Sequence, residues 1–157
     1  MFKHGTIHDV VVRTLSKYID DRGWLAELYR RDEIAGEFFP AMGYVSMTAE
    51  GVTRGPHEHV DQADCFAFIG PSNFKIWLWD NRKDSPGYMT RQIVYAGEDA
   101  PRAVIIPPGV VHAYTNIGGK QGMVLNFPNR LYAGEGKKNP VDEIRHETDP
   151  KSIFRLE

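Results

Sequence analysis

Short runs of β-branched and aromatic residues, separated by turn residues, recur along this chain at roughly the 8–12-residue spacing typical of a β-sandwich or barrel. Glycine- and proline-containing turns between them, such as Gly70-Pro71-Ser72-Asn73, favour hairpins. The pattern therefore predicts antiparallel strands and no long helix. The predicted strands lie near Val10–Leu15, Trp24–Tyr29, Ala41–Met47, Asp64–Ile69, Phe74–Trp79, Arg91–Val94, Ala103–Ile106, Val111–Asn116 and Gly122–Phe127.

The predicted strand Phe74–Trp79 is apolar on both faces. Period-two alternation places Phe74, Ile76 and Leu78 on one face and the two tryptophans of the strand on the other. We expect this strand to be buried on two sides, as at a contact between sheets or between subunits. The alternative is that the tryptophans only cap one end of a barrel.

Length and charge narrow the class of protein. A chain of 157 residues fits a single domain spanning 1–157. The 19 Lys and Arg residues are interspersed with 21 Asp and Glu residues for a net charge of -2, which argues against a nucleic-acid partner. Apolar runs such as Ala103–Ile106 fall far short of the ~20 residues that a membrane helix needs.

The N-terminus and the cysteine content indicate a cytoplasmic location. The first residues lack the basic start and apolar stretch of a signal peptide. Cys65 is the only cysteine, which rules out an internal disulfide.

Three of the six histidines stand at spacings that resemble the two sequence motifs of the cupin superfamily. In the first motif, Gly51, His57, His59, Asp64 and Gly70 follow one another at the expected intervals. In a strand, the two histidines of a His-x-His pair project from one face, so their imidazoles can converge on one atom.

The second motif has the form Pro-x-Gly-x-x-His-x-x-x-Asn. Its fixed positions are matched by Pro107, Gly109, His112 and Asn116. Two independently spaced matches imply an all-β cupin jelly-roll barrel of antiparallel strands with a histidine-lined pocket. They say less about chemistry, because one fold supports many activities.

A metal site is one interpretation of these residues. Convergence of His57, His59, Asp64 and His112 would supply three imidazoles and a carboxylate, which suits Fe, Mn, Ni or Zn. Asp64 stands where the superfamily usually has a glutamate that is one methylene longer. The alternative is that these histidines only form hydrogen bonds within a polar lumen. The remaining histidines match neither motif, and we expect them at the surface: His4, His8 and His146.

A longer series of motifs runs in order over most of the chain. It comprises Asp21-Arg22-Gly23-Trp24 with Glu27, Gly51–His57, Asp84-Ser85-Pro86, Pro107–His112 and Asp149-Pro150. Together these motifs resemble the dTDP-4-dehydrorhamnose 3,5-epimerase family of nucleotide-sugar cupins. The resemblance implies an epimerase or isomerase of a 4-keto-6-deoxy nucleotide sugar that requires no cofactor. It also implies a homodimer built through the N-terminal strands.

The resemblance assigns roles to individual residues. His57 stands at the position of the base that removes a proton next to the 4-keto group, and imidazole titrates near working pH. Arg22 and Arg54 would hold the diphosphate or the developing negative charge. The other residues expected to contact the substrate are Glu27, His59, Gln62, His112 and Asn126.

Some positions depart from the family's catalytic set. The family's catalytic tyrosine corresponds to Asn126, which cannot act as a general acid, and Tyr132 is the surviving candidate for that role. A family lysine is replaced by Asp64, which exchanges a positive for a negative charge. The chain ends before the region where the family carries the aspartate that orients the base, and Asp64 or Glu58 are candidates to replace it.

The C-terminal stretch from Tyr132 to Glu157 is more polar than the rest and too short to fold alone. We expect it to form an arm over the barrel mouth.

Three classes of function remain, in this order. The first is a nucleotide-sugar epimerase or isomerase with His57 as base. The second is a metal-dependent cupin enzyme, for example an isomerase or dioxygenase, which the pair of His59 and Asp64 favours. The third is a non-catalytic protein that binds a sugar or a sugar nucleotide, which the missing tyrosine favours.

Overall fold

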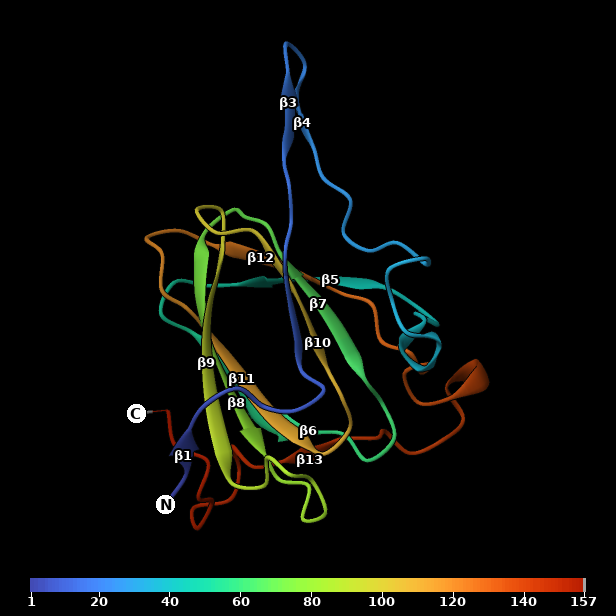
Figure 1. Ribbon diagram of the computed structural model, residues 1–157, viewed down its shortest axis with the longest axis vertical. Helices are drawn as coiled ribbons and strands as arrows, with labels where there is room; N and C mark the ends of the chain where they lie inside the picture. Colours follow the sequence, from blue (N-terminus) through green and yellow to red (C-terminus); the bar gives the residue numbers. More distant parts are fainter. Residues whose placement is uncertain (157) are drawn as a thin grey trace.

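The strands form two facing sheets and a separate hairpin in the computed structural model, which describes residues 1–156 (Figure 1). The six-stranded sheet has the order β1-β9-β8-β11-β6-β13. Its strands are β1 (Lys3–His4), β6 (Thr53–Glu58), β8 (Asn73–Asp80), β9 (Thr90–Gly97), β11 (Val110–Asn116) and β13 (Ile144–Arg145). All pairs in it are antiparallel except β1 with β9.

The five-stranded sheet is antiparallel throughout and has the order β2-β10-β7-β12-β5. Its strands are β2 (Val11–Thr14), β5 (Tyr44–Thr48), β7 (Asp64–Phe68), β10 (Arg102–Ile106) and β12 (Gly122–Asn126). The hairpin of β3 (Tyr18–Asp20) and β4 (Gly23–Leu25) projects away from the barrel (Figure 1). The predicted all-β cupin jelly roll is confirmed.

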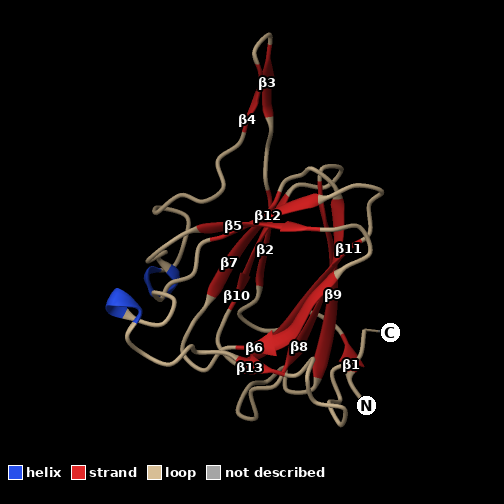
Figure 2. Ribbon diagram, turned by 180° about the vertical axis from the view of Figure 1, so that it is seen from behind, coloured by secondary structure: helices blue, strands red, loops and turns tan. Residues whose placement is uncertain are grey.

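Two short 3₁₀ helices, η1 (Gly36–Phe38) and η2 (Glu135–Lys137), lie near each other on the β5 side of the barrel (Figure 2). None of the helices formed by residues 1–156 has the length and apolar character that crossing a membrane would require.

Inward-facing side chains of both sheets fill the barrel with an apolar core. Phe68, Phe74 and Leu78 are fully buried in it, and each such side chain contributes roughly 1.5–3 kcal/mol to stability. Phe66 and Tyr114 belong to this core and also line the pocket. The apolar core therefore forms the floor on which the polar site rests.

The outer face of β8 is also buried, as the alternation in Phe74–Trp79 predicted. Trp77 is 5% and Trp79 0% exposed, and both pack in a cluster with Phe154 near the C-terminus. Phe2 joins this cluster from the N-terminus. The cover is therefore supplied by the terminal segments of the same chain, and the tryptophans do not cap a barrel end.

Differences between predicted and observed strands have local causes. The predicted strand Trp24–Tyr29 is too long, because β4 ends at Leu25 and the following residues have no regular structure. Strand β6 was missed, because Gly55-Pro56 reads as a turn and proline lacks the N–H that a ladder needs. The strands β1, β3 and β13 are only two or three residues long, too short for a periodic pattern.

The C-terminal arm covers the mouth, as expected, and then continues along the outside. Residues from Tyr132 to Glu143 line the pocket. Strand β13 next pairs with β6, placing Arg145 opposite His57. The chain then reaches the outer face of the six-stranded sheet, where the rings of Phe154 and Trp79 lie 5.9 Å apart.

We predict that Phe154→Ala lowers the free energy of unfolding by about 3 kcal/mol, because it leaves a cavity over Trp79. The matched control is Ile153→Ala, since Ile153 is 57% exposed and its loss should change stability by less than about 0.5 kcal/mol. Denaturant unfolding followed by tryptophan fluorescence measures both. Equal stability of the two variants would show that the arm is not anchored by this contact.

Candidate active site

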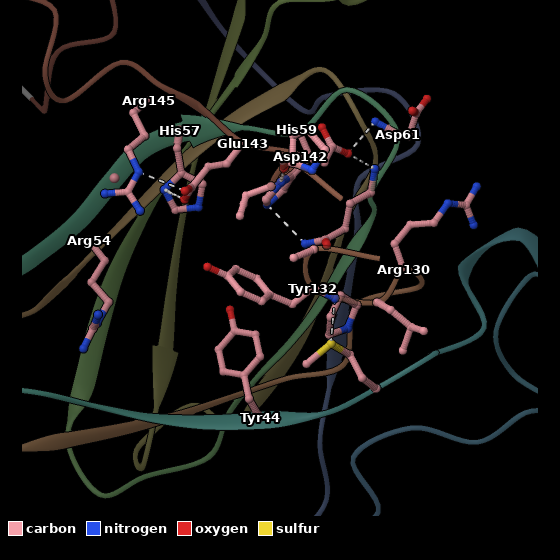
Figure 3. A pocket seen from close by; sticks show the side chains of 18 of the residues that line it. Tyr44, Arg54, His57, His59, Asp61, Arg130, Tyr132, Asp142, Glu143 and Arg145 are labelled. Carbon is pink, nitrogen blue, oxygen red and sulfur yellow. Dashed lines mark hydrogen bonds and ion pairs between the residues drawn. The ribbon is translucent and has the colours of Figure 1, made fainter. Parts of the chain in front are cut away.

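A cavity of about 880 Å³ opens at the barrel mouth, between β5, β6 and the C-terminal arm (Figure 3). This is within the range of ligand sites, roughly 300–1,000 Å³. Strand β5 contributes Tyr44 and Ser46, β6 contributes Arg54 and His57, and the arm contributes Tyr132 among others. The wall is therefore built from two rigid strands and one loop-rich segment.

Gly55 sets the position of the first histidine. It has a φ of +84°, and a Cβ on it would lie 2.5 Å from the carbonyl oxygen of His112, so only glycine fits. The register between β6 and β11 shifts next to it, and His57 pairs directly with His112. Their rings lie 4.4 Å apart.

The second motif is mainly structural. Asn116 is fully buried and accepts hydrogen bonds from the Ser72 hydroxyl and the Gly118 N–H. Its amide donates to the carbonyl oxygens of Thr48 and Lys120. The asparagine thus fixes the loops at the far end of β11, and only the histidine of this motif belongs to the site.

The structure brings together the residues of the two motifs. His57, His59 and His112 each offer a ligand atom within 4.8 Å of the others. The buried carboxylate of Asp64 lies 3.2 Å from Nε2 of His59 and 3.3 Å from Nε2 of His112. It also accepts a hydrogen bond from Gln62. Three imidazoles around a carboxylate are a donor set that fits a divalent transition metal.

Charge in this cluster is paired. Burial would raise the pKa of Asp64, but the adjoining imidazoles of His112 and His59 outweigh it and hold that pKa below its ordinary value. Burial would likewise lower the pKa of His59, but Asp64 and then Asp142 outweigh it and raise the pKa to about 9. His59 is therefore cationic at neutral pH, so Asp64 is a paired anion.

His57 has the opposite protonation state. Burial, followed by the neighbouring His112 and His59, lowers the pKa of His57 to about 2. Its imidazole is therefore neutral. The same burial disfavours the imidazolium, so proton uptake by His57 requires a nearby counterion. Its Nδ1 lies 3.8 Å from the carboxylate of Glu143, which is held by Arg145 at 2.9 Å (Figure 3).

Glu143 was not predicted from the sequence, and neither Glu58 nor Asp64 takes its place beside His57. Consecutive residues of a strand face opposite ways, so Glu58 lies on the other face of β6 and contacts His146 at 2.9 Å. Glu143 was missed because an acidic residue in an irregular arm gives no periodic signal.

The expectation that His146 is a surface residue is wrong, because His146 is half-buried in its pair with Glu58.

Asn126 is 1% exposed and is held from three sides. Its amide donates to Asp64 at 2.8 Å and to the Tyr44 hydroxyl at 3.0 Å, and its oxygen accepts from the Cys65 N–H. His112, at 2% exposure, is buried behind the wall as well. Tyr132 lines the cavity, as expected. Sequence reasoning missed two further phenols there, Tyr44 and the core residue Tyr114.

The cavity also carries cationic side chains. Arg54 lines it, as predicted, with Nε bonded to the Thr48 hydroxyl and Nη2 to the Met47 carbonyl oxygen. Further cations in the wall were not predicted: Arg130, Lys137 and Arg145. This wall can bind an anion.

Arg22 and Glu27 do not line this cavity. Arg22 lies on the projecting β3–β4 hairpin, where it pairs with Asp20, and Glu27 contacts Arg30. The prediction that Arg22 faces the same pocket as Arg54 is therefore wrong for a single chain, because the hairpin extends away from its own barrel (Figure 1).

A jelly-roll barrel with a histidine-lined pocket at its mouth defines a cupin. The family model described as dTDP-4-dehydrorhamnose 3,5-epimerase matches residues 4–139. The chain belongs to this family, as the sequence motifs predicted.

Two curated relatives share 35% identity with the chain. One is the "probable low-salt glycan biosynthesis epimerase Agl13" of Haloferax volcanii, matched over 80% of this chain and 81% of the relative. The other is the "spore coat polysaccharide biosynthesis protein SpsL" of Bacillus subtilis, matched over 94% and 93%. A solved dTDP sugar isomerase from Desulfovibrio desulfuricans G20 has the same fold, with a TM-score of 0.80, 19% identity and coverage of 95% and 91%.

We predict that Asp64→Asn lowers the pKa of His59 from about 9, because burial is then no longer outweighed by the carboxylate. NMR titration of the His59 ring measures it. Because the pKa of His59 is higher in the folded protein, its protonation stabilises the fold fully below pH 6.5, the ordinary pKa of histidine. This stabilisation is lost as the pH rises through about 9. The stability of the Asp64→Asn variant should not fall over this pH range. Asp61→Asn, an exposed carboxylate in the same loop, is the charge-matched control.

Proposed function

We propose that this protein epimerises a nucleotide-linked 4-keto-6-deoxy sugar, with His57 removing the proton next to the ketone. The observation that carries the proposal is a buried, neutral imidazole at the wall of the cavity, with the Glu143 carboxylate 3.8 Å away. Family membership supplies the reaction class.

The reaction needs a base, a stabilised enolate and an acid. His57 takes the proton from the carbon next to the ketone, and the electron pair of the broken C–H bond moves onto the ketone oxygen. The imidazolium that forms is stabilised by Glu143. Protonation of the enolate on its opposite face inverts the carbon. The donor is a phenol of the cavity, Tyr132 or Tyr44, or water.

Cations in the wall match the charge of such a substrate. We propose that Arg54, together with Arg130 and Arg145, binds the diphosphate or the enolate oxygen. His59 and Gln62 line the cavity and remain proposed substrate contacts. His112 and Asn126 act from behind them by holding Asp64. None of these steps calls on a metal ion.

The three-histidine cluster favours one second candidate, a metal-dependent cupin enzyme using His57, His59, Asp64 and His112. Elemental analysis of the purified protein separates the two. Near-stoichiometric transition metal supports the metal enzyme. Metal-free protein that retains full activity supports the epimerase.

We propose a homodimer built through the N-terminal hairpin. Its side chains stand exposed on the projecting strands, with Ile19 80% and Leu25 64% exposed, and large apolar patches of this kind mark interfaces. Since Arg22 lies outside its own cavity, its predicted role in anion binding requires that the hairpin reach a second copy.

The single cysteine, the buried and unpaired Cys65, supports a cytoplasmic location.

We predict that incubation with dTDP-4-keto-6-deoxyglucose in deuterated water removes the C3 or C5 proton signal in the NMR spectrum. His57→Asn should slow this exchange at least about 10²-fold, because it removes the base. His8→Asn, at an exposed histidine, is the control. Tight binding without exchange of any keto-sugar nucleotide would favour the non-catalytic binding protein.

A second prediction concerns the dimer. Mixing inactive Arg22→Ala and His57→Asn dimers should restore about one quarter of wild-type activity, because half of the re-formed dimers carry one intact shared site. Sedimentation at micromolar concentration measures the oligomer. A monomer of 17.8 kDa, or no recovery on mixing, would show that each site is built from one chain.

A further inference from the structure

Tyr44 lies beside the position at which the family's catalytic tyrosine, a proton donor, is absent from this chain. In the antiparallel pair of β5 and β12, Tyr44 is directly opposite Asn126, the residue at the position of the family's catalytic tyrosine. The Tyr44 hydroxyl is 3.0 Å from the Asn126 amide nitrogen. The neighbouring strand therefore places a phenol beside the position where the family's own phenol is absent.

The direction of this hydrogen bond leaves the phenol proton available. The Asn126 amide donates to the Tyr44 oxygen and also to Asp64, while its own oxygen accepts from the Cys65 N–H. These three contacts fix the orientation of the amide, because a reversed amide would turn its oxygen toward the Asp64 carboxylate. The hydrogen of Tyr44 is thus free for a ligand in the cavity.

The surroundings of Tyr44 keep its phenol protonated. Burial raises the pKa of Tyr44 to about 12, although the hydrogen bond from Asn126 opposes this rise. The phenol is therefore protonated at neutral pH, as a proton donor must be. After donation, the same N–H of Asn126 stabilises the phenolate.

Tyr44 also lies on the appropriate side of the cavity. Its side chain extends from β5 toward the cavity across from His57 (Figure 3). Tyr44 and Tyr132 are similarly exposed, at 45% and 56%, but Tyr132 comes from the arm and lies outside regular structure. A group on a strand with a fixed hydroxyl is held more closely than one on a loop.

We infer that Tyr44 is the general acid that protonates the enolate on the face opposite His57. This inference rests on the proposed function. The O–H bond of Tyr44 breaks as the electron pair of the enolate forms the new C–H bond, and the ketone is restored. Tyr44 is left as phenolate and His57 as imidazolium. Between turnovers, solvent takes a proton from His57 and supplies one to Tyr44.

The test is Tyr44→Phe with dTDP-4-keto-6-deoxyglucose in deuterated water. We expect C–H exchange within about tenfold of wild type, because His57 can remove a proton and return deuterium to the same face. The inverted sugar should form about 10²–10⁴-fold more slowly. Borohydride reduction followed by NMR coupling constants reports the configuration. Tyr132→Phe tests the competing phenol of the cavity. The matched control is Tyr95→Phe, at an exposed phenol that does not line the cavity, and it should leave both exchange and inversion unchanged.

Each other outcome overturns the inference. Inversion that survives Tyr44→Phe, or that is lost in Tyr132→Phe with exchange intact, assigns the acid elsewhere. Loss of both exchange and inversion in a Tyr44→Phe variant with a wild-type circular dichroism spectrum shows a role other than opposite-face acid. Failure of the proposed function itself is distinct, because the wild-type protein would then show no exchange.

Discussion

The buried carboxylate of Asp64 is the interaction on which the polar site depends. It is 1% exposed and is satisfied by His59, His112, Gln62 and Asn126. Removing one partner of such a buried charge typically costs about 3–5 kcal/mol. Because Asp64 lies on β7 and its partners come from β11, β12 and the loop after β6, one group ties both sheets together beneath the cavity. These contacts hold the polar wall of the cavity in place.

The proposed base, His57, is supported differently, from the side of the C-terminal arm. His57 lies on β6, but its acidic neighbour Glu143 comes from the arm, immediately before β13. The arm is fixed by pairing with β6 and by the packing of Phe154 on Trp79. Contacts on the outer face of the sheet therefore position a carboxylate at the mouth of the barrel.

Periodic and motif signals predicted the barrel and the histidine cluster, and family motifs pointed to His57 and Arg54. The groups that complete the site were beyond such reasoning. Glu143 and Arg145 follow an irregular segment without periodicity, and Tyr44 becomes meaningful only through its register with Asn126. Cross-strand register and the course of an arm are tertiary facts that a single sequence does not contain.

The two departures from the family's catalytic set form one network rather than two independent losses. By the sequence resemblance, Asp64 stands at a lysine position and Asn126 at a tyrosine position. The Asn126 amide donates hydrogen bonds to Asp64 and to the Tyr44 hydroxyl. With tyrosine at 126, Asp64 would lose a donor. The two positions are therefore coupled by a direct hydrogen bond, and Tyr44 provides a hydroxyl at the end of the same chain of hydrogen bonds.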